Sequence, residues 1–206
     1  MNPPISINPP KDGASGCVAP GTCAQEHADR KPPSGHTTAI VTRVTIPTYP
    51  DAPFEPLPMF AEHRVHQRTS GRVYPNAVVN SVVRNQRSEK DYTAIVLENE
   101  FIALTILPEL GGRICSARDK TNNYDFFYRQ HVIKPALIGL LGSWVSGGAE
   151  FNWPTHHRPS TFMPVDFHIE RAPDGSATVW LSEHEPMDRM KGMIGIHLHP
   201  RHARLE

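Results

Sequence analysis

The sequence predicts a mainly β protein whose antiparallel strands form a sandwich, and three observations lead to this fold class. Short segments enriched in Val, Ile, Thr, Tyr and Phe recur along the chain, as strands require. Gly, Asn, Asp and Pro separate these segments at short intervals, which is typical of turns. Only residues 132–144 resemble a helix, and Pro135, Gly139 and Gly142 argue against a long regular one. No repeat with a period of about 20–50 residues is visible, which disfavours propellers and solenoids.

The predicted strands follow an N-terminal tail. Residues 1–36 are rich in Pro, Gly, Ser and Asp, and they cannot bury enough apolar surface to offset their ordering entropy, so we expect disorder there. Residues 37–206 are assigned to the folded domain, because residues 37–49 are β-branched with partial alternation until Pro47 interrupts them. Further strands are predicted at residues 63–67, 77–85, 91–100, 101–108, 113–119, 125–129, 166–172, 177–185 and 194–200.

Turn signals join these strands. The clearest hairpin is expected at Pro173-Asp174-Gly175, between residues 166–172 and 177–185. Trp180, inside this hairpin, is interpreted as a core residue. Other turns are expected at Ser70-Gly71, Asn99-Glu100, Gly111-Gly112 and Asn122-Asn123.

The composition narrows the classes of partner. The chain has 206 residues, enough for one domain or for a piece of a larger one, and its 21 basic residues balance 21 acidic ones. This balance gives no attraction to nucleic acid or to an anionic membrane. No apolar run of about 18 residues and no secretory signal is present, so a cytoplasmic location is predicted. Three cysteines make no disulfide framework, and no cofactor fingerprint is found.

The stretch from Leu107 to Ser160 carries the chemistry of interest. It places Arg, Glu, Asn, Trp and paired His in loops that Gly and Pro shape. A pyranose offers apolar C–H faces to an aromatic ring and hydroxyls to planar polar side chains, so a sugar site needs both kinds of residue. The stretch therefore predicts a carbohydrate groove.

Several runs in this region and after it carry a family resemblance: LPELGGRI, DKTNNYDFFYR, GGAEFNWPTHHRPS and DGSATVWLSEHEPMDRMKG. Together they resemble an uncharacterised bacterial domain family of the galactose-mutarotase-like superfamily, whose members often carry tetratricopeptide repeats after the domain. The resemblance covers roughly residues 40–206. It implies an antiparallel supersandwich that binds carbohydrate, in a superfamily that includes aldose epimerases and other sugar-processing enzymes.

The chain is shorter than the family domain, and the resemblance implies that it is the N-terminal portion. In aldose epimerases of the superfamily a late carboxylate acts as the base, and its counterpart would lie beyond Glu206. The sandwich is therefore expected to be incomplete. Two readings of function stay open: a carbohydrate-binding domain, as part of a sugar epimerase or glycoside-active enzyme, and a non-catalytic interaction module or fragment without activity.

Glu150, Asn152 and Trp153 are the first candidate site residues. If residues 149–153 are extended, alternation puts Glu150 and Asn152 on one face and Phe151 and Trp153 on the other. Glu150 is assigned a hydrogen-bonding or base role, against the alternative of a structural edge-strand carboxylate. Trp153 could stack under a pyranose, against the alternative of a core residue.

Histidine and arginine side chains complete the predicted site. His156 and His157 point opposite ways in an extended chain, so one of them could enter the groove and protonate a ring oxygen. Arg113 could bind a sugar, or form a salt bridge to Asp119 or Glu109, and Arg158 could orient Glu150. No metal site is predicted.

The remaining metal candidates are weak. His197 and His199 share a strand face but lack a third ligand with diagnostic spacing. In the tail, Cys17 and Cys23 would need two further ligands, so they are interpreted as incidental thiols.

Overall fold

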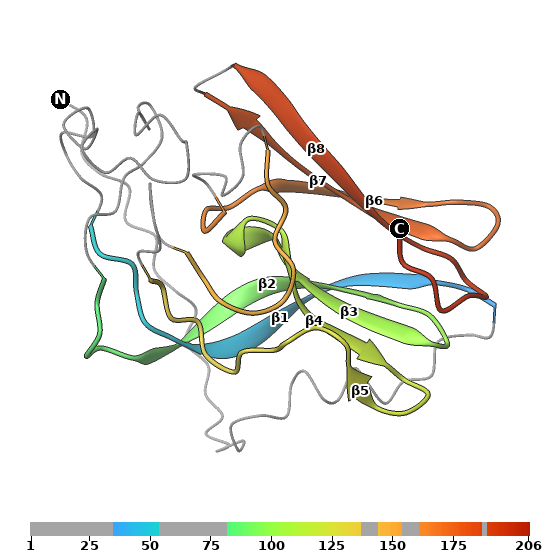
Figure 1. Cartoon of the computed structure of the whole chain (residues 1–206). Helices are drawn as coiled ribbons and strands as arrows, with labels where there is room; N and C mark the ends of the chain where they lie inside the picture. The colour runs from blue at the N-terminus through green and yellow to red at the C-terminus, as the bar shows by residue number, and fades with distance from the viewer. Residues whose placement is uncertain (1–34, 54–81, 137–143, 154–160, 187–188) are drawn as a thin grey trace, which may run out of the picture.

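The computed structural model describes residues 35–53, 82–136, 144–153, 161–186 and 189–206. Within these residues the protein is mainly β, with two antiparallel sheets layered on one another and one short 3₁₀ turn, η2 (Pro108–Leu110) (Figure 1). The larger sheet has the order β1-β2-β3-β4-β5 and the smaller one the order β6-β7-β8. Their strands are β1 (Thr38–Thr48), β2 (Ser88–Glu98), β3 (Ile102–Leu107), β4 (Arg113–Asp119), β5 (Tyr124–Asp125), β6 (Asp166–Arg171), β7 (Ala177–Glu185) and β8 (Met190–Leu198).

The antiparallel β prediction is confirmed, and most predicted strands coincide with observed ones. Three differ most in extent: β2 begins at Ser88, three residues before the predicted start at 91, β5 is only two residues long, and β8 begins at Met190, four residues before the predicted start at 194. The residues from Met190 to Met193 pair with the end of β7, so the neighbouring strand determines their conformation. The predicted strand 63–67, most of 77–85 and almost all of the tail 1–36 lie outside the described residues.

The main hydrophobic core lies between the two sheets. Leu97, Leu104 and Ile106 of the larger sheet are fully buried against Val179 and Leu181 of the smaller sheet. A β-bulge at Cys115 in β4 breaks the register with β3, because Thr105 pairs with Ser116 whereas Ile106 pairs with Ile114. The extra residue keeps Ile114 and Ala117 on the same core face although they are three positions apart.

The hairpin between β6 and β7 forms as predicted. Gly175 has φ 87°, and its N–H donates to the carbonyl of Ala172. Asp174 accepts hydrogen bonds from the backbone N–H of Ser176 at 2.9 Å and from its hydroxyl at 2.7 Å. These bonds lower the pKa of Asp174.

The prediction for Trp180 is wrong. Its neighbours Val179 and Leu181 fill the core, so period-two alternation turns Trp180 to the opposite face of the small sheet. There its indole lies against Gly195 and its Nε1 donates to Glu170 Oε2 at 2.7 Å. Within the described part of the chain, no helix is long and apolar enough to cross a membrane.

Candidate functional site

The candidate site lies on the face of the larger sheet that points away from β6–β8, here called the outer face. A second hydrophobic cluster covers this face, with Val44, Tyr92, Ala94 and Leu107 from the strands and Ile133 and Val145 from the connecting segments. Alternation along β2 separates the two clusters, since Tyr92 and Ala94 point outward whereas Ile95 and Leu97 point to the core. The outer face therefore has its own apolar packing, separate from the core between the two sheets.

Residues 144–153 reach this face by joining the free side of β4. Ala149 and Ile114 exchange backbone hydrogen bonds at 2.9 and 3.0 Å, and Ala149 and Phe151 pack against the inter-sheet core. Glu150 and Asn152 consequently lie on the outer face, where Asn152 Nδ2 donates to Glu150 Oε1 at 3.2 Å. This agrees with the alternation that the sequence predicts for these residues.

Two glycines make that approach possible. Gly147 and Gly148 have φ angles of 89° and 70°, in the left-handed region that side chains disfavour. A Cβ on Gly148 would lie 1.9 Å from the carbonyl oxygen of Ile114. That oxygen accepts the hydrogen bond of Ala149, so a side chain at position 148 would break the attachment to β4.

The side chain of Arg113 also holds residues 145–150 in place. Its side chain is 3% exposed, and Nη1 donates to the carbonyls of Val145 at 2.5 Å and Gly147 at 2.9 Å. Nη2 donates to Glu150 Oε2 at 3.2 Å, and Glu150 keeps 19% of its side chain exposed. Burial lowers the pKa of Arg113, and the carboxylate of Glu150 opposes this shift. The guanidinium thus holds a partly exposed carboxylate in a defined orientation.

The predicted site residues therefore separate into three groups. Arg113, Glu150 and Asn152 come together, although the salt-bridge alternatives expected for Arg113, with Asp119 or Glu109, do not form: its partner is Glu150. Trp153 lies on the opposite side of its strand segment, where its indole fills the space over Gly192 in β8. The structure does not bring it beside Glu150. The last group, His156, His157 and Arg158, lies outside the described residues.

A pocket of about 310 Å³ opens at the edge of the outer-face cluster, where β1 ends and β2 begins. We call it the Tyr92 pocket. Val145 links it to the candidate site, because its side chain lines the pocket while its carbonyl binds Arg113. The sequence analysis did not find this pocket. Its lining is Thr48, Tyr49, Pro50, Asp51, Ser88, Lys90, Tyr92, Glu109, Leu110, Ile133, Pro135, Val145, Phe162, Met163 and Pro164.

Cys115 is a free thiol on the outer face next to Arg113. Desolvation by burial raises its pKa to about 11, although Arg129 and Arg113 act in the opposite direction. The thiol is therefore protonated at neutral pH. A thiolate nucleophile or metal ligand at this position does not fit that environment.

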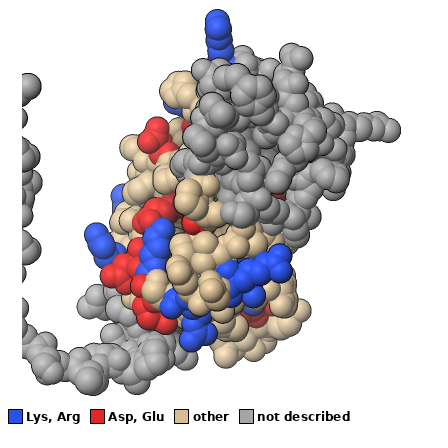
Figure 2. Space-filling view, turned by 90° about the vertical axis from the view of Figure 1, so that its left-hand side faces the viewer, with Lys and Arg blue, Asp and Glu red and all other residues tan. Residues whose placement is uncertain are grey.

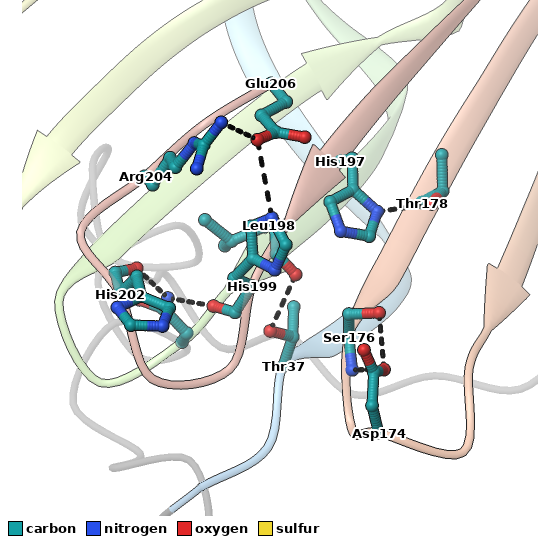
Figure 3. A network of polar contacts seen from close by, with 11 residues as sticks. Thr37, Asp174, Ser176, Thr178, His197, Leu198, His199, His202, Arg204 and Glu206 are labelled. Carbon is teal, nitrogen blue, oxygen red and sulfur yellow. Dashed lines mark hydrogen bonds and ion pairs between the residues drawn. The ribbon is translucent and has the colours of Figure 1, made fainter.

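A polar network at the end of the chain contains the histidines considered as metal ligands (Figure 3). The rings of His197 and His199 meet edge to face at 4.5 Å between centroids, His197 Nδ1 contacts the hydroxyl of Thr178 at 2.8 Å, and His199 lies 3.5 Å from Glu206. Among the described residues, no three or more His, Cys, Asp or Glu side chains are arranged to hold a metal ion. These histidines take part in packing the chain's last residues.

Comparisons with known proteins place this fold and site in context. Residues 68–206 match the model of a family described as a domain of unknown function, DUF5107. The structure is also similar to the crystal structure of a TPR-domain containing protein from Parabacteroides distasonis ATCC 8503, with a TM-score of 0.73 and 26% sequence identity. The match covers 84% of this chain and 28% of that protein, so the chain spans under a third of its length.

Proposed function

Since the chain belongs to the DUF5107 family of domains of unknown function, we propose on the chemistry of its outer face that it is a carbohydrate-binding domain of the galactose-mutarotase-like type. The observation that carries the proposal is the Arg113–Glu150–Asn152 arrangement. A carboxylate that keeps 19% of its side chain exposed and an exposed amide lie side by side at the edge of the outer face, held by a buried guanidinium. Planar polar groups fixed in this way are suited to the paired hydroxyls of a sugar.

Mixed surface charge supports a neutral ligand. On the face shown in Figure 2, Lys and Arg side chains are interspersed with Asp and Glu. A nucleic-acid partner requires a continuous basic surface, whereas a neutral sugar requires none. The balance of 21 basic and 21 acidic residues over the whole chain supports the same choice.

Recognition is favoured over proton transfer as the role of Glu150. Both of its carboxylate oxygens already accept hydrogen bonds, Oε2 from Arg113 and Oε1 from Asn152. A carboxylate held in a fixed orientation can accept hydrogen bonds from ligand hydroxyl groups through its remaining lone pairs. In a catalytic parent protein, Glu150 would act with His156 or His157 during ring opening of an aldose, and this assignment stays part of the proposal.

The supersandwich assignment belongs to the same proposal. Two antiparallel sheets with a core between them are compatible with one end of such a fold. The similar structure from Parabacteroides distasonis is a TPR-domain containing protein, and the resemblance implies tetratricopeptide repeats in the same protein as the domain. We propose that this chain supplies the sugar-recognising part of a longer architecture.

The test is saturation-transfer difference NMR with a panel of neutral mono- and oligosaccharides. Wild type should give saturable transfer to at least one sugar, and Glu150→Gln should weaken that binding about tenfold, because Gln replaces one carboxylate oxygen with a donor. Glu100→Gln, at an exposed turn position between β2 and β3, is the matched control and should bind like wild type. Equal binding by wild type and Glu150→Gln would refute the assignment of the site. Polarimetry of freshly dissolved α-anomers measures any mutarotation separately.

A further inference from the structure

The Tyr92 pocket is a preformed cavity, because backbone hydrogen bonds join its walls. The N–H of Tyr49 donates to the carbonyl of Ile133 at 2.9 Å, and the N–H of Ile133 donates to the carbonyl of Pro47 at 2.9 Å. On the other side, Gly111 donates to Met163 at 2.8 Å. These bonds tie segments that are distant in sequence into one rim. A ligand would therefore meet a fixed shape and would not have to order a loop.

The lining combines an apolar body with a polar rim. Leu110, Ile133, Val145 and Phe162 form buried or nearly buried apolar walls, and Tyr49 adds an aromatic face. The rim carries Ser88, Lys90, Asp51 and Glu109. This pairing of aromatic and aliphatic surface with a few hydroxyl and carboxylate groups is the chemistry that a pyranose ring requires.

Tyr92 anchors the base of the pocket as a neutral phenol. It is 1% exposed, and its hydroxyl lies 3.0 Å from the hydroxyl of Thr48. Desolvation by burial raises its pKa, against the Thr48 hydrogen bond, which lowers it. The carboxylates of Glu109 and Asp51, which line the same pocket, raise the pKa of Tyr92 further.

The charges of the lining distinguish between classes of sugar. Two carboxylates, Asp51 and Glu109, face one ammonium group, that of Lys90. The Lys90 ammonium lies 4.6 Å from the centre of the Tyr92 ring, and Lys134 lies 5.0 Å from the centre of the Tyr49 ring. Both ammonium groups are thus engaged on aromatic faces. Two carboxylates and two ammonium groups therefore balance in and beside the pocket, so a phosphate or carboxylate on the ligand would gain no net attraction there.

Glu109 has the capacity to accept a ligand hydroxyl. Its Oε1 accepts the backbone N–H of Thr93 at 2.7 Å, which fixes the orientation of the carboxylate. Within the described residues, its second oxygen accepts no hydrogen bond. A sugar hydroxyl in the pocket could donate to this oxygen without displacing an internal partner.

We propose that the Tyr92 pocket is a subsite for a single neutral pyranose ring, adjoining the Glu150 surface through Val145. The inference rests on the proposed function and adds a substrate class and a location to it. The volume of about 310 Å³ lies at the lower end of the ~300–1,000 Å³ range of small-molecule sites, which suits one ring and not a long oligosaccharide.

The test is a ¹H–¹⁵N NMR titration of the full chain with methyl β-D-glucopyranoside and methyl β-D-galactopyranoside. Saturable shifts are expected at the amides of Thr48, Tyr49 and Glu109. Ser88→Trp should weaken binding about tenfold, because an indole at this exposed rim position fills part of the pocket. Glu89→Trp is the matched control: it is the next residue of β2, exposed as well, and alternation turns it to the other face. It should bind within about twofold of wild type.

The results of this titration distinguish the pocket proposal from the proposal that the domain binds carbohydrate. Shifts confined to Glu150 and Asn152, with Ser88→Trp binding like wild type, would overturn the pocket and leave carbohydrate binding intact. No saturable shift with any neutral sugar would overturn both. The 6-phosphates of glucose and galactose should bind no more tightly than the neutral sugars, because the two carboxylates and two ammonium groups in and beside the pocket give an anion no net attraction. Tighter binding of the phosphates than of the neutral sugars would refute the neutral class.

Discussion

Replacing Arg113 with Met should destabilise the protein strongly, because one buried guanidinium holds three groups. The substitution keeps an unbranched side chain of similar length but removes every hydrogen-bond donor. It leaves the carbonyls of Val145 and Gly147 without the donor that bonds them at 2.5 and 2.9 Å, and it removes the charge 3.2 Å from Glu150.

The expected loss follows from these contacts. Breaking a buried ion pair by removing one partner costs about 3–5 kcal/mol, and the 19% exposure of Glu150 favours the lower end. An orphaned buried carbonyl adds about 1–3 kcal/mol. With one buried carbonyl, that of Val145, the total expected for Arg113→Met is about 4–6 kcal/mol. Glu150→Gln should cost only about 1 kcal/mol, because the amide oxygen of Gln can still accept from Arg113.

Guanidinium chloride unfolding, followed by far-UV circular dichroism and Trp fluorescence, measures these free energies. The double variant should be less destabilised than the sum of the single variants by about 1–2 kcal/mol, since Arg113 and Glu150 are in direct contact. A loss below about 1 kcal/mol for Arg113→Met, or strict additivity in the cycle, would refute the view that Arg113 organises the site.

Three further predictions concern single positions. Asn99→Ala should lower the free energy of unfolding by about 3–5 kcal/mol, because this fully buried amide makes four hydrogen bonds. The control Asn122→Ala, at an exposed position, should lower it by about 0.5 kcal/mol. Equal losses of unfolding free energy in chemical denaturation would contradict this prediction. Gly148→Ala should lower the free energy of unfolding by more than about 3 kcal/mol, and Gly35→Ala by about 1 kcal/mol. Both glycines have a positive φ, but only at position 148 would the added Cβ clash with a backbone oxygen. Similar melting temperatures of the two variants would contradict the steric argument. The contribution of Cys115 to the free energy of unfolding should be fully present below about pH 9, and it should fall by about 1.4 kcal/mol per pH unit up to the folded pKa of about 11. If wild type and Cys115→Ala show the same dependence of stability on pH, this prediction is wrong.

Local chemistry made much of the fold predictable. Val, Ile and Thr in residues 91–107 alternate between core and outer face, and β2 and β3 form there. The hairpin at Gly175 follows from the need for a positive φ between two strands. The assignment of Trp180 to the core was wrong because alternation along a strand leaves open which face is buried: Val179 and Leu181 take the inward positions and Trp180 the other face.

Only part of the candidate site could be predicted, because some of its residues lie far apart in the sequence. Glu150 and Asn152 are two positions apart, so alternation alone placed them on one face. The pairing of Glu150 with Arg113 depends on how residues 144–150 return to β4, 37 positions away, and no local pattern encodes that return. Arg158, which the sequence analysis expects to orient Glu150, lies outside the described residues.

The Tyr92 pocket could not be predicted from any single segment. Its walls come from the end of β1, the start of β2, η2 and three connecting segments. The sequence offers one local signal, the carboxylate of Glu109 between a predicted strand and the Gly111-Gly112 turn.

The most direct test of the central claim is the dissociation constant of a neutral methyl pyranoside for wild type, Glu150→Gln and Glu100→Gln, measured by NMR titration on folded protein. The account predicts saturable binding by wild type and by Glu100→Gln, with about tenfold weaker binding by Glu150→Gln. Identical dissociation constants for all three, or no binding by any of them, would contradict it.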